Sequence, residues 1–261
     1  MMSGVPRHPA DMQPDATIET LLRERTRFRR LVHVPSCTST QELAAGGADG
    51  ADAVFWADHQ THGRGRQQRE WHDEPGADLT ATFRISATLP MPLALPAALP
   101  VAVLEACEPA AGCQLRIKWP NDLILDGRKL CGVLIDAGVG SSDTYLIGVG
   151  VNCNRVRFPR DLESIASSLA IATGHEVDRG SLLLAIAERI HTMLIDLQQQ
   201  RHERLEELFR DRLGLVGQQV FVEAASEHEG VLTGLDFHNL QLDGTQTVPL
   251  AIVRGIRRAA R

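Results

Sequence analysis

The polar side chains best placed for chemistry lie in residues 116–138, a stretch of apolar strands interrupted by two turns. Proline followed by Asn-Asp marks the first turn, and Asp-Gly is a strong hairpin signal for the second. Around these turns stand Lys118, Asn121, Asp122 and Lys129. A strand buried on both faces seldom holds two lysines without a use for them. Lysines placed on an edge strand to limit aggregation are an equally simple interpretation.

A second stretch, residues 60–71, alternates glycine with arginine and is called the glycine loop below. Gly63 and Gly65 let the backbone turn and bring N–H groups close to a ligand. Three arginines supply forked donors that suit phosphate or carboxylate: Arg64, Arg66 and Arg69. The loop lacks the Gly-Lys-Ser/Thr of a Walker A loop and the third glycine of a dinucleotide fingerprint. An anion site and a solvated loop that contacts RNA both fit this composition.

Hydrophobic periodicity and turn residues predict the elements that hold these two stretches. Strands are expected at 31–34, 53–59, 79–86, 114–119 and 143–154, and helices at 17–30, 97–107, 164–173 and 178–213, the last interrupted near 201–203. A hydroxyl-rich turn at 36–42 opens a further short helix. In the 143–154 strand, Gly148 and Gly150 indicate close approach of a ligand or another backbone.

Beyond Gly217 the pattern changes to short strands divided by turns. They are expected at 220–222, 230–234, 240–242 and 247–250, with Asp243-Gly244 at a hairpin turn. So many short strands in so little chain favour a small barrel of the SH3 type.

Composition narrows the class of protein. A net charge of −6 argues against a protein whose main work is binding nucleic acid through phosphates. The five cysteines show no Cys-x-x-Cys pattern, which is typical of reduced thiols and gives no reason to expect a metal site. The uncharged run at 85–104 carries four prolines, so it predicts a buried helix after a loop and no membrane span. Because the N-terminus also lacks the apolar core of a secretory signal, we expect a soluble, cytoplasmic protein.

In this order and spacing, the two polar stretches resemble biotin protein ligase. The match rests on Gly63-Arg64-Gly65-Arg66 with Arg69 and Trp71, on Lys118-Trp119-Pro120-Asn121-Asp122, and on Arg128-Lys129-Leu130-Cys131-Gly132. Ser39-Thr40, Gln60 and Gly148-Val149-Gly150-Val151-Asn152 also match, and the resemblance covers residues 31–261.

The resemblance implies an α+β fold. A mixed β-sheet with flanking helices, related to class II aminoacyl-tRNA synthetases, would be followed by a small C-terminal SH3-like β-barrel. The corresponding domains are an N-terminal tail and helix at 1–30, a catalytic domain of the biotin–lipoyl ligase type at 31–214, and the SH3-like domain at 215–261.

The resemblance also implies a two-step reaction. Biotin and MgATP give biotinyl-5′-AMP and pyrophosphate, and the adenylate then acylates one lysine of a biotin carboxyl carrier protein or carboxylase subunit. The implied catalytic residues are Arg64, Lys118, Asp122 and Lys129, with no assignable Mg²⁺ ligand. The implied biotin-binding residues are Ser39, Thr40, Gln41, Gln60, Arg64, Gly65, Arg66, Lys129 and Gly132. The implied nucleotide-binding residues are Gly63, Arg64, Arg66, Arg69, Trp71, Lys118, Asn121 and Asn152.

These residue types suit the reaction on physical grounds. Arg64 and Lys118 can neutralise the repulsion between a carboxylate and an anionic nucleotide. By resemblance, Lys129 lies at the activated carbonyl, where a cation stabilises developing negative charge, and Trp71 stacks on the adenine. Hydroxyl and amide groups can satisfy the polar atoms of a buried ureido ring. Asp122 either helps the incoming amine lose its proton or serves as a turn residue that bonds the local backbone.

Three positions depart from the family pattern. Gln41 and Asp78 stand where asparagine is common, and Gln68 stands where glycine is common. A stiffer glycine loop would bind the adenylate differently. We expect this loop to be mobile when empty and to close over the adenylate, which keeps water from a hydrolysable mixed anhydride.

Other functions remain open at this stage. A lipoate or octanoate ligase or transferase shares the fold and the acyl-lysine chemistry, and a non-catalytic biotin-binding regulator would share the pocket. A DNA-binding repressor is disfavoured, because residues 1–30 are too few for a winged-helix module and the net charge is negative. Neither nucleic acid nor a membrane is an expected partner, and monomer and weak homodimer are both open.

Overall fold

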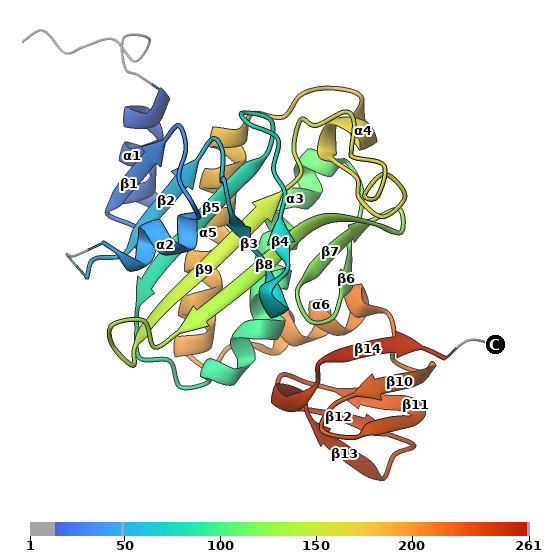
Figure 1. Cartoon of the computed structure of the whole chain (residues 1–261). Helices are drawn as coiled ribbons and strands as arrows, with labels where there is room; N and C mark the ends of the chain where they lie inside the picture. Colours follow the sequence, from blue (N-terminus) through green and yellow to red (C-terminus); the bar gives the residue numbers. More distant parts are fainter. Residues whose placement is uncertain (1–13, 48–49, 260–261) are drawn as a thin grey trace, which may run out of the picture.

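The computed structural model describes residues 14–47 and 50–259, which form two β-sheets with helices packed against the larger one (Figure 1). The expected N-terminal tail falls mostly on residues 1–13, which lie outside the described residues. The larger sheet carries both polar stretches, and the smaller sheet is formed by the C-terminal part of the chain.

The larger sheet has seven strands in the order β1-β2-β5-β9-β8-β7-β6. Their bounds are β1 (Arg30–Val34), β2 (Ala53–Ala57), β5 (Leu79–Ser86), β9 (Thr144–Val151), β8 (Arg128–Ala137), β7 (Asp122–Leu125) and β6 (Arg116–Lys118). Since β1 and β2 are parallel and the other neighbours are antiparallel, the expected mixed sheet is confirmed. The 116–138 stretch forms β6, β7 and β8 at one edge.

Both faces of this sheet are covered. On one side lie α1 (Pro14–Arg25), α3 (Leu95–Ala111), α5 (Arg179–Gln198) and α6 (Glu203–Leu213), with α3 packed against α5 and α6 (Figure 1). Side chains alternate along β2, so Val54 and Trp56 join this main core. Ala53 and Phe55 point the other way and pack with Ala44 of the short helix α2 (Thr40–Ala45).

Helix α3 is the apolar centre of the main core. The segment Pro92–Ala111 is long and apolar enough to cross a membrane by length and composition, and 67% of it is buried inside the fold. A core helix passes the same test, and this one packs against α5 and α6. The predicted buried helix at 97–107 is therefore confirmed, although it extends further at both ends.

Two predicted helices are shorter than the sequence indicated. The first ends at Arg25, because the backbone N–H of Arg29 donates to Asp52 O and the chain then enters β1. The predicted helix at 164–173 is wrong over 164–168, and only α4 (Leu169–Thr173) forms. The segment before α4 instead bonds to β8: Lys129 N donates to Ile165 O, and Ser167 N donates to Lys129 O.

The smaller sheet is antiparallel and has five strands in the order β13-β12-β11-β10-β14. They are β10 (Gln219–Glu223), β11 (Glu227–Leu235), β12 (Asn239–Leu242), β13 (Gln246–Pro249) and β14 (Gly255–Arg258). Asp243 and Gly244 have φ angles of 52° and 71° and turn β12 into β13, as their sequence predicts.

Aromatic packing joins the smaller sheet to the larger one. Trp119, in the turn between β6 and β7, is buried and donates its indole N–H to Val253 O at 2.9 Å. Its ring meets that of Phe209 on α6 edge-on, with centroids 5.8 Å apart, and Phe209 in turn contacts Phe237 at 6.1 Å. One buried aromatic cluster therefore holds the turn of the first polar stretch and the C-terminal sheet together.

We expect Phe209→Ala to lower the free energy of unfolding by about 3 to 5 kcal/mol, because the ring is fully buried between both sheets and its loss leaves a cavity. Urea denaturation followed by circular dichroism measures this change. Glu207→Ala, on an exposed position of the same helix, is the matched control and should change stability by less than about 0.5 kcal/mol. Equal effects of the two substitutions would contradict the proposed role of Phe209.

Candidate active site

The glycine loop lies over β8 and β9 (Figure 1). A cavity of about 340 Å³ opens between the loop and these strands. The loop forms a small hairpin of β3 (Gly63–Arg64) and β4 (Glu70–Trp71), with a 3₁₀ turn at Arg66–Gln68 between them. The cavity is lined by the following residues: Ser39, Thr40, Gln41, Gln60, Arg64, Gly65, Arg66, Gln67, Arg69, Glu70, Trp71, Thr80, Ala81, Lys118, Trp119, Pro120, Asn121, Asp122, Lys129, Gly132, Val133, Leu134, Gly148, Val149, Gly150, Glu223 and Arg254. All expected biotin-binding residues and all expected catalytic residues are among them.

Hydroxyl and amide groups line one part of the cavity. Ser39 caps α2 by accepting the Gln41 N–H, which places Thr40 in the first turn of the helix. Gln60 Oε1 accepts from Thr40 N at 2.8 Å and from Thr40 Oγ1 at 3.1 Å. Thr82 Oγ1 donates to Thr40 Oγ1 at 2.9 Å. Because these groups are buried and bonded to one another, they form a preorganised polar surface.

Gln41 lies across the strand β9. Its Nε2 donates to Asp136 Oδ2 and to Leu146 O, both at 3.4 Å, and the side chain is buried. A Cβ atom on Gly148 would lie 3.3 Å from Gln41 Cδ, so glycine gives this side chain room. The close approach that the sequence predicted at Gly148 is therefore made by Gln41.

Positively charged side chains surround the other part of the cavity. Arg64 Nη1 lies 3.4 Å from Asp136 Oδ2, and Lys118 stands exposed on the edge strand β6. Burial lowers the pKa of the Arg66 guanidinium from its ordinary value, while nearby Asp122 raises it. A partly desolvated guanidinium gains more from an anionic partner than one in bulk water does. The cavity thus favours a negatively charged ligand.

Lys129 and Asp122 form an ion pair at the cavity wall. Lys129 Nζ lies 2.7 Å from Asp122 Oδ1 and 5.5 Å from the centre of the Trp71 ring. Asp122 begins β7 and Lys129 lies on β8, and the register of the β7–β8 ladder shifts between Leu123 and Ile124. The sequence left open that both lysines are charges on an edge strand. Lys129 lies on the inner strand β8, so this interpretation is wrong for Lys129, but Lys118 does lie on an edge strand.

Trp71 lies flat on the sheet. A Cβ atom on Gly150 would come within 2.5 Å of Trp71 Cε2, and one on Gly132 within 3.1 Å of Cζ3. The indole Nε1 is buried and makes no hydrogen bond among the described residues. Such a donor is costly to leave unpaired, which makes this ring a candidate to move when a ligand enters.

Two expected nucleotide-binding residues do not lie on the cavity wall. Asn152 is buried, and its Nδ2 donates to Lys129 O at 3.3 Å and to Ser167 O at 2.9 Å, so it fixes the backbone behind the wall. At Gly63 a Cβ atom would collide with Trp71 O, so this glycine lets the two arms of the loop approach. Asn121 does line the cavity, with its Nδ2 donating to Val133 O at 3.0 Å.

Two of the positions that depart from the family pattern, Gln41 and Asp78, have structural partners. Asp78 is buried in an ion pair with Arg155 Nη2 at 2.6 Å and accepts from Glu74 N and Cys153 N. Burial raises the pKa of Asp78, although Arg155 and these N–H groups lower it. The turn at Gln67 has a φ of 55°, and the side chain of Gln68 lies outside the described residues.

Sequence reasoning missed Glu223 and Arg254, which reach the cavity from the smaller sheet. Arg254 N donates to Glu223 O at 2.7 Å, so the two residues are neighbours. Glu223 lies 73 residues and Arg254 lies 104 residues beyond Gly150, the last lining residue of the larger sheet, and no local pattern sets them apart. Only the packing of the smaller sheet beside the Trp119 turn brings them to the site.

The cysteines among the described residues are poor candidates for a thiolate nucleophile. Burial, followed by Asp73 and Glu42, raises the pKa of Cys37, and burial raises the pKa of Cys153 to about 12. Raised pKa values keep these thiols protonated at neutral pH. Residues 14–47 and 50–259 also contain no group of three His, Cys, Asp or Glu side chains that could hold a metal ion.

The structure is a mixed α+β sheet with a cavity whose wall is polar in one part and cationic in another. Comparison with known proteins shows a likeness to one family. Residues 47–154 match the model of the biotin/lipoate A/B protein ligase family. The chain resembles the biotin protein ligases of this family.

Individual relatives show the same likeness. The chain is 36% identical over 174 residues to the bifunctional ligase/repressor BirA of Bacillus subtilis, covering 62% of this chain and 53% of the relative. It therefore spans about half the length of the Bacillus relatives that it matches. It is also 28% identical over 234 residues to a biotin--[acetyl-CoA-carboxylase] ligase of Paracoccus denitrificans, covering 82% of this chain and 96% of that one.

A solved structure shows the same fold. The biotin protein ligase from Aquifex aeolicus in complex with biotin and ATP has a TM-score of 0.79 and 26% identity to this chain, covering 89% of it and 100% of the Aquifex chain. The expected mixed sheet with flanking helices is thus that of a biotin ligase, and a small antiparallel sheet follows it.

We expect Gly150→Ala to displace Trp71 from the sheet, because the new Cβ would come within 2.5 Å of the ring. Tryptophan fluorescence should shift to longer wavelength as the indole meets water. Gly46→Ala is the matched control, since its Cβ would meet only ordinary contacts at 3.6 Å. An unchanged spectrum in Gly150→Ala would mean that Trp71 does not rest on β9 in solution.

Proposed function

We propose that this protein is an ATP-dependent biotin ligase that forms biotinyl-5′-AMP and then transfers biotin to a lysine of a biotin carboxyl carrier protein or carboxylase subunit. The observation that carries the proposal is the convergence of hydroxyl and amide groups with Arg64, Arg66, Lys118 and Lys129 on one cavity. Biotin has a polar ureido ring at one end and a carboxylate at the other. The hydroxyl and amide groups suit the ring, and the cationic side chains suit the carboxylate.

In the first step a carboxylate oxygen of biotin would bond to the α-phosphorus of ATP while the bond to pyrophosphate breaks. The approach of two anions is opposed by Coulomb repulsion, which the arginines and Lys118 offset by neutralising charge on both. Arg66 is well suited to this role, because partial burial strengthens its interaction with a phosphate. Thr40 and Gln60 would bind the ureido ring through groups already held in place.

Magnesium would enter with the nucleotide. The acidic side chains of the described cavity wall are Glu70, Asp122 and Glu223, which come from separate segments and form no metal cluster. Phosphate oxygens and water commonly supply most of the Mg²⁺ ligands in nucleotide sites, where the ion neutralises phosphate charge.

In the second step the neutral amine of the carrier lysine would attack the acyl carbon, and AMP would leave with the electron pair of the broken C–O bond. Lys129 can stabilise the oxyanion that develops on the carbonyl. A free lysine has a pKa of about 10.4, so the amine must first lose a proton. We assign this proton, or the orientation of the amine, to Asp122, whose carboxylate lies 2.7 Å from Lys129 Nζ.

The remaining parts of the chain take supporting roles in this proposal. The glycine loop would close over the adenylate and keep water from it. We propose that residues 215–261 form an SH3-like barrel beside the catalytic domain at 31–214 and contribute Glu223 and Arg254 to ATP or carrier binding. A reducing compartment such as the cytoplasm is supported by the five free cysteines.

We expect biotin-dependent exchange of labelled pyrophosphate into ATP, because the first step is reversible and needs no acceptor protein. Lipoate and octanoate serve as parallel substrates and should give no exchange, since they lack the ureido ring. Exchange with lipoate alone would move the protein to the lipoate ligases of the same family. Biotin binding without exchange would indicate a non-catalytic regulator.

We expect Asp122→Asn to slow transfer of biotin from preformed biotinyl-5′-AMP to the carrier by about 100-fold, because the amide cannot accept the proton. Single-turnover kinetics with purified adenylate measure this step without adenylation. Asp126→Asn, on the exposed turn between β7 and β8, is the control. A normal transfer rate in Asp122→Asn would make Asp122 a turn residue only.

A further inference from the structure

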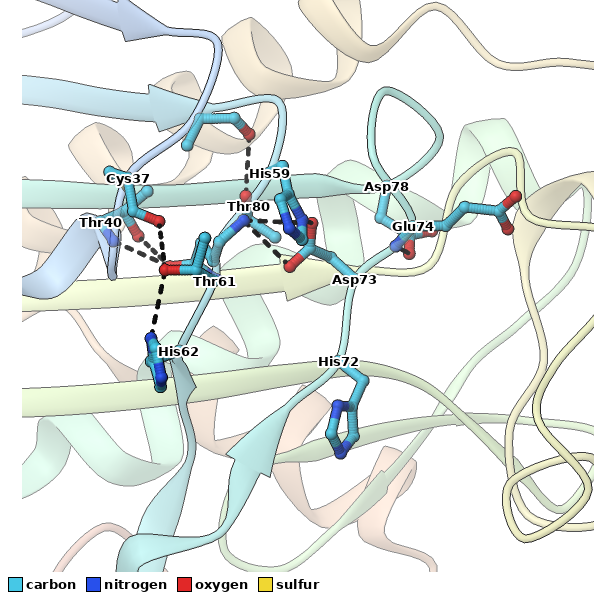
Figure 2. Close-up of polar contacts among 12 residues, drawn as sticks. Cys37, Thr40, His59, Thr61, His62, His72, Asp73, Glu74, Asp78 and Thr80 are labelled. Atoms are coloured by element: carbon cyan, nitrogen blue, oxygen red, sulfur yellow. Dashed lines mark hydrogen bonds and ion pairs between the residues drawn. The ribbon is translucent and has the colours of Figure 1, made fainter.

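Asp73 is a buried carboxylate just outside the cavity wall. It follows Trp71 by two residues, where the glycine loop returns to the large sheet, and its side chain is only 1% exposed. His59 Nδ1 lies 3.0 Å from Asp73 Oδ2, and the backbone N–H of Gln60 donates to the two carboxylate oxygens at 3.2 and 3.3 Å. Figure 2 shows Asp73 directed at His59, whereas the neighbouring His72 points away from this group.

These contacts tie the two ends of the glycine loop together. His59 and Gln60 belong to the segment that enters the loop, and Asp73 belongs to the segment that leaves it. A buried carboxylate is costly unless it is hydrogen-bonded or paired, and the two groups bonded to Asp73, His59 Nδ1 and the Gln60 N–H, both lie on the entering segment. Asp73 therefore fixes where the entering segment runs relative to the loop.

The same bond fixes the Gln60 side chain. With the Gln60 backbone held by Asp73, Gln60 Oε1 accepts from Thr40 N and Thr40 Oγ1, which use the lone pairs of that oxygen. The group that Gln60 can still offer a ligand is its Nε2 donor. Gln60 and Thr40 both line the cavity, so the position of this donor depends on Asp73, which touches no ligand itself.

We propose that Asp73 is a positioning residue for biotin: it holds the backbone of Gln60, and through it the Gln60–Thr40 pair that receives the ureido ring. The inference rests on the proposed function, because it assigns biotin to this end of the cavity. Asp73 sets the affinity for biotin and has no part in the chemistry of either step.

The test measures biotin affinity by titration calorimetry for the full chain and its variants. Asp73→Ala should raise the Kd for biotin by about 10-fold or more, in line with the loss of a charge-assisted hydrogen bond to a binding group. Asp73→Asn keeps an oxygen that can accept the Gln60 N–H, so it should recover part of the affinity. In pyrophosphate exchange the KM for biotin should rise, while kcat stays within about twofold.

A double-mutant cycle separates positioning from general damage. Gln60→Ala removes the side chain through which Asp73 acts but keeps the backbone N–H that Asp73 binds. Adding Asp73→Ala to Gln60→Ala should therefore cost little further affinity for biotin. If the double variant loses affinity by the product of the two single-variant factors, the proposal is overturned. An unchanged Kd in Asp73→Ala would overturn it too. Glu74→Gln is the control, because this neighbouring acid pairs with Arg155 and lies off the cavity wall.

Hydrogen exchange of the free protein provides a readout that needs no ligand. The Gln60 amide should exchange faster in Asp73→Ala than in the unaltered chain and in Glu74→Gln, while core strands such as β5 stay protected. Equal protection of the Gln60 amide would overturn the anchoring role. If the unaltered chain binds no biotin, the proposed function fails, and the exchange result still decides whether Asp73 holds Gln60.

Discussion

The site depends on how closely side chains from other segments can lie on the sheet. Gly148 and Gly150 on β9 and Gly132 on β8 carry no Cβ atoms, so Gln41 and Trp71 rest directly on the strands. A Cβ atom at Gly150 would collide with the Trp71 ring, and one at Gly148 or Gly132 would crowd Gln41 or Trp71. Bare backbone at the centre of the sheet is thus the condition for a small, enclosed site.

Charge is balanced inside this enclosure. The cavity gathers arginines and lysines that repel one another when no anion is present, and acidic side chains offset part of that repulsion. Asp136 lies beside Arg64, and Asp122 lies beside Lys129. When an anionic ligand binds, Arg64 and Lys129 can exchange these carboxylates for the ligand and so remain paired. In the empty site the same ion pairs reduce the repulsion between the cations.

The sequence predicts the parts of this site that local patterns encode. Glycines, arginines and turn residues at fixed spacing located the loop, the turn at Trp119 and the ends of most strands. It failed where a partner lies far along the chain. The sequence predicts a helix over residues 164–168, but the backbone of this segment bonds to Lys129 instead. Likewise, the short polar side chains of Asp73 and Asn152 fit many turns, and only the folded chain shows which backbone groups they bind.

Lys129 illustrates how the fold divides support between backbone and side chain. Its N–H and C=O are bonded to Ile165 O and Ser167 N, and Asn152 adds a donor to the same carbonyl. The main chain at this position is therefore fixed from the side opposite the cavity. Its ammonium group, by contrast, is held among the described residues by the Asp122 carboxylate and the Trp71 ring, both at the cavity wall. Because a firm backbone limits where the flexible stem can reach, the head group can change partners and still remain at the cavity wall. Asn152 thus supports the backbone at Lys129 without itself lining the cavity.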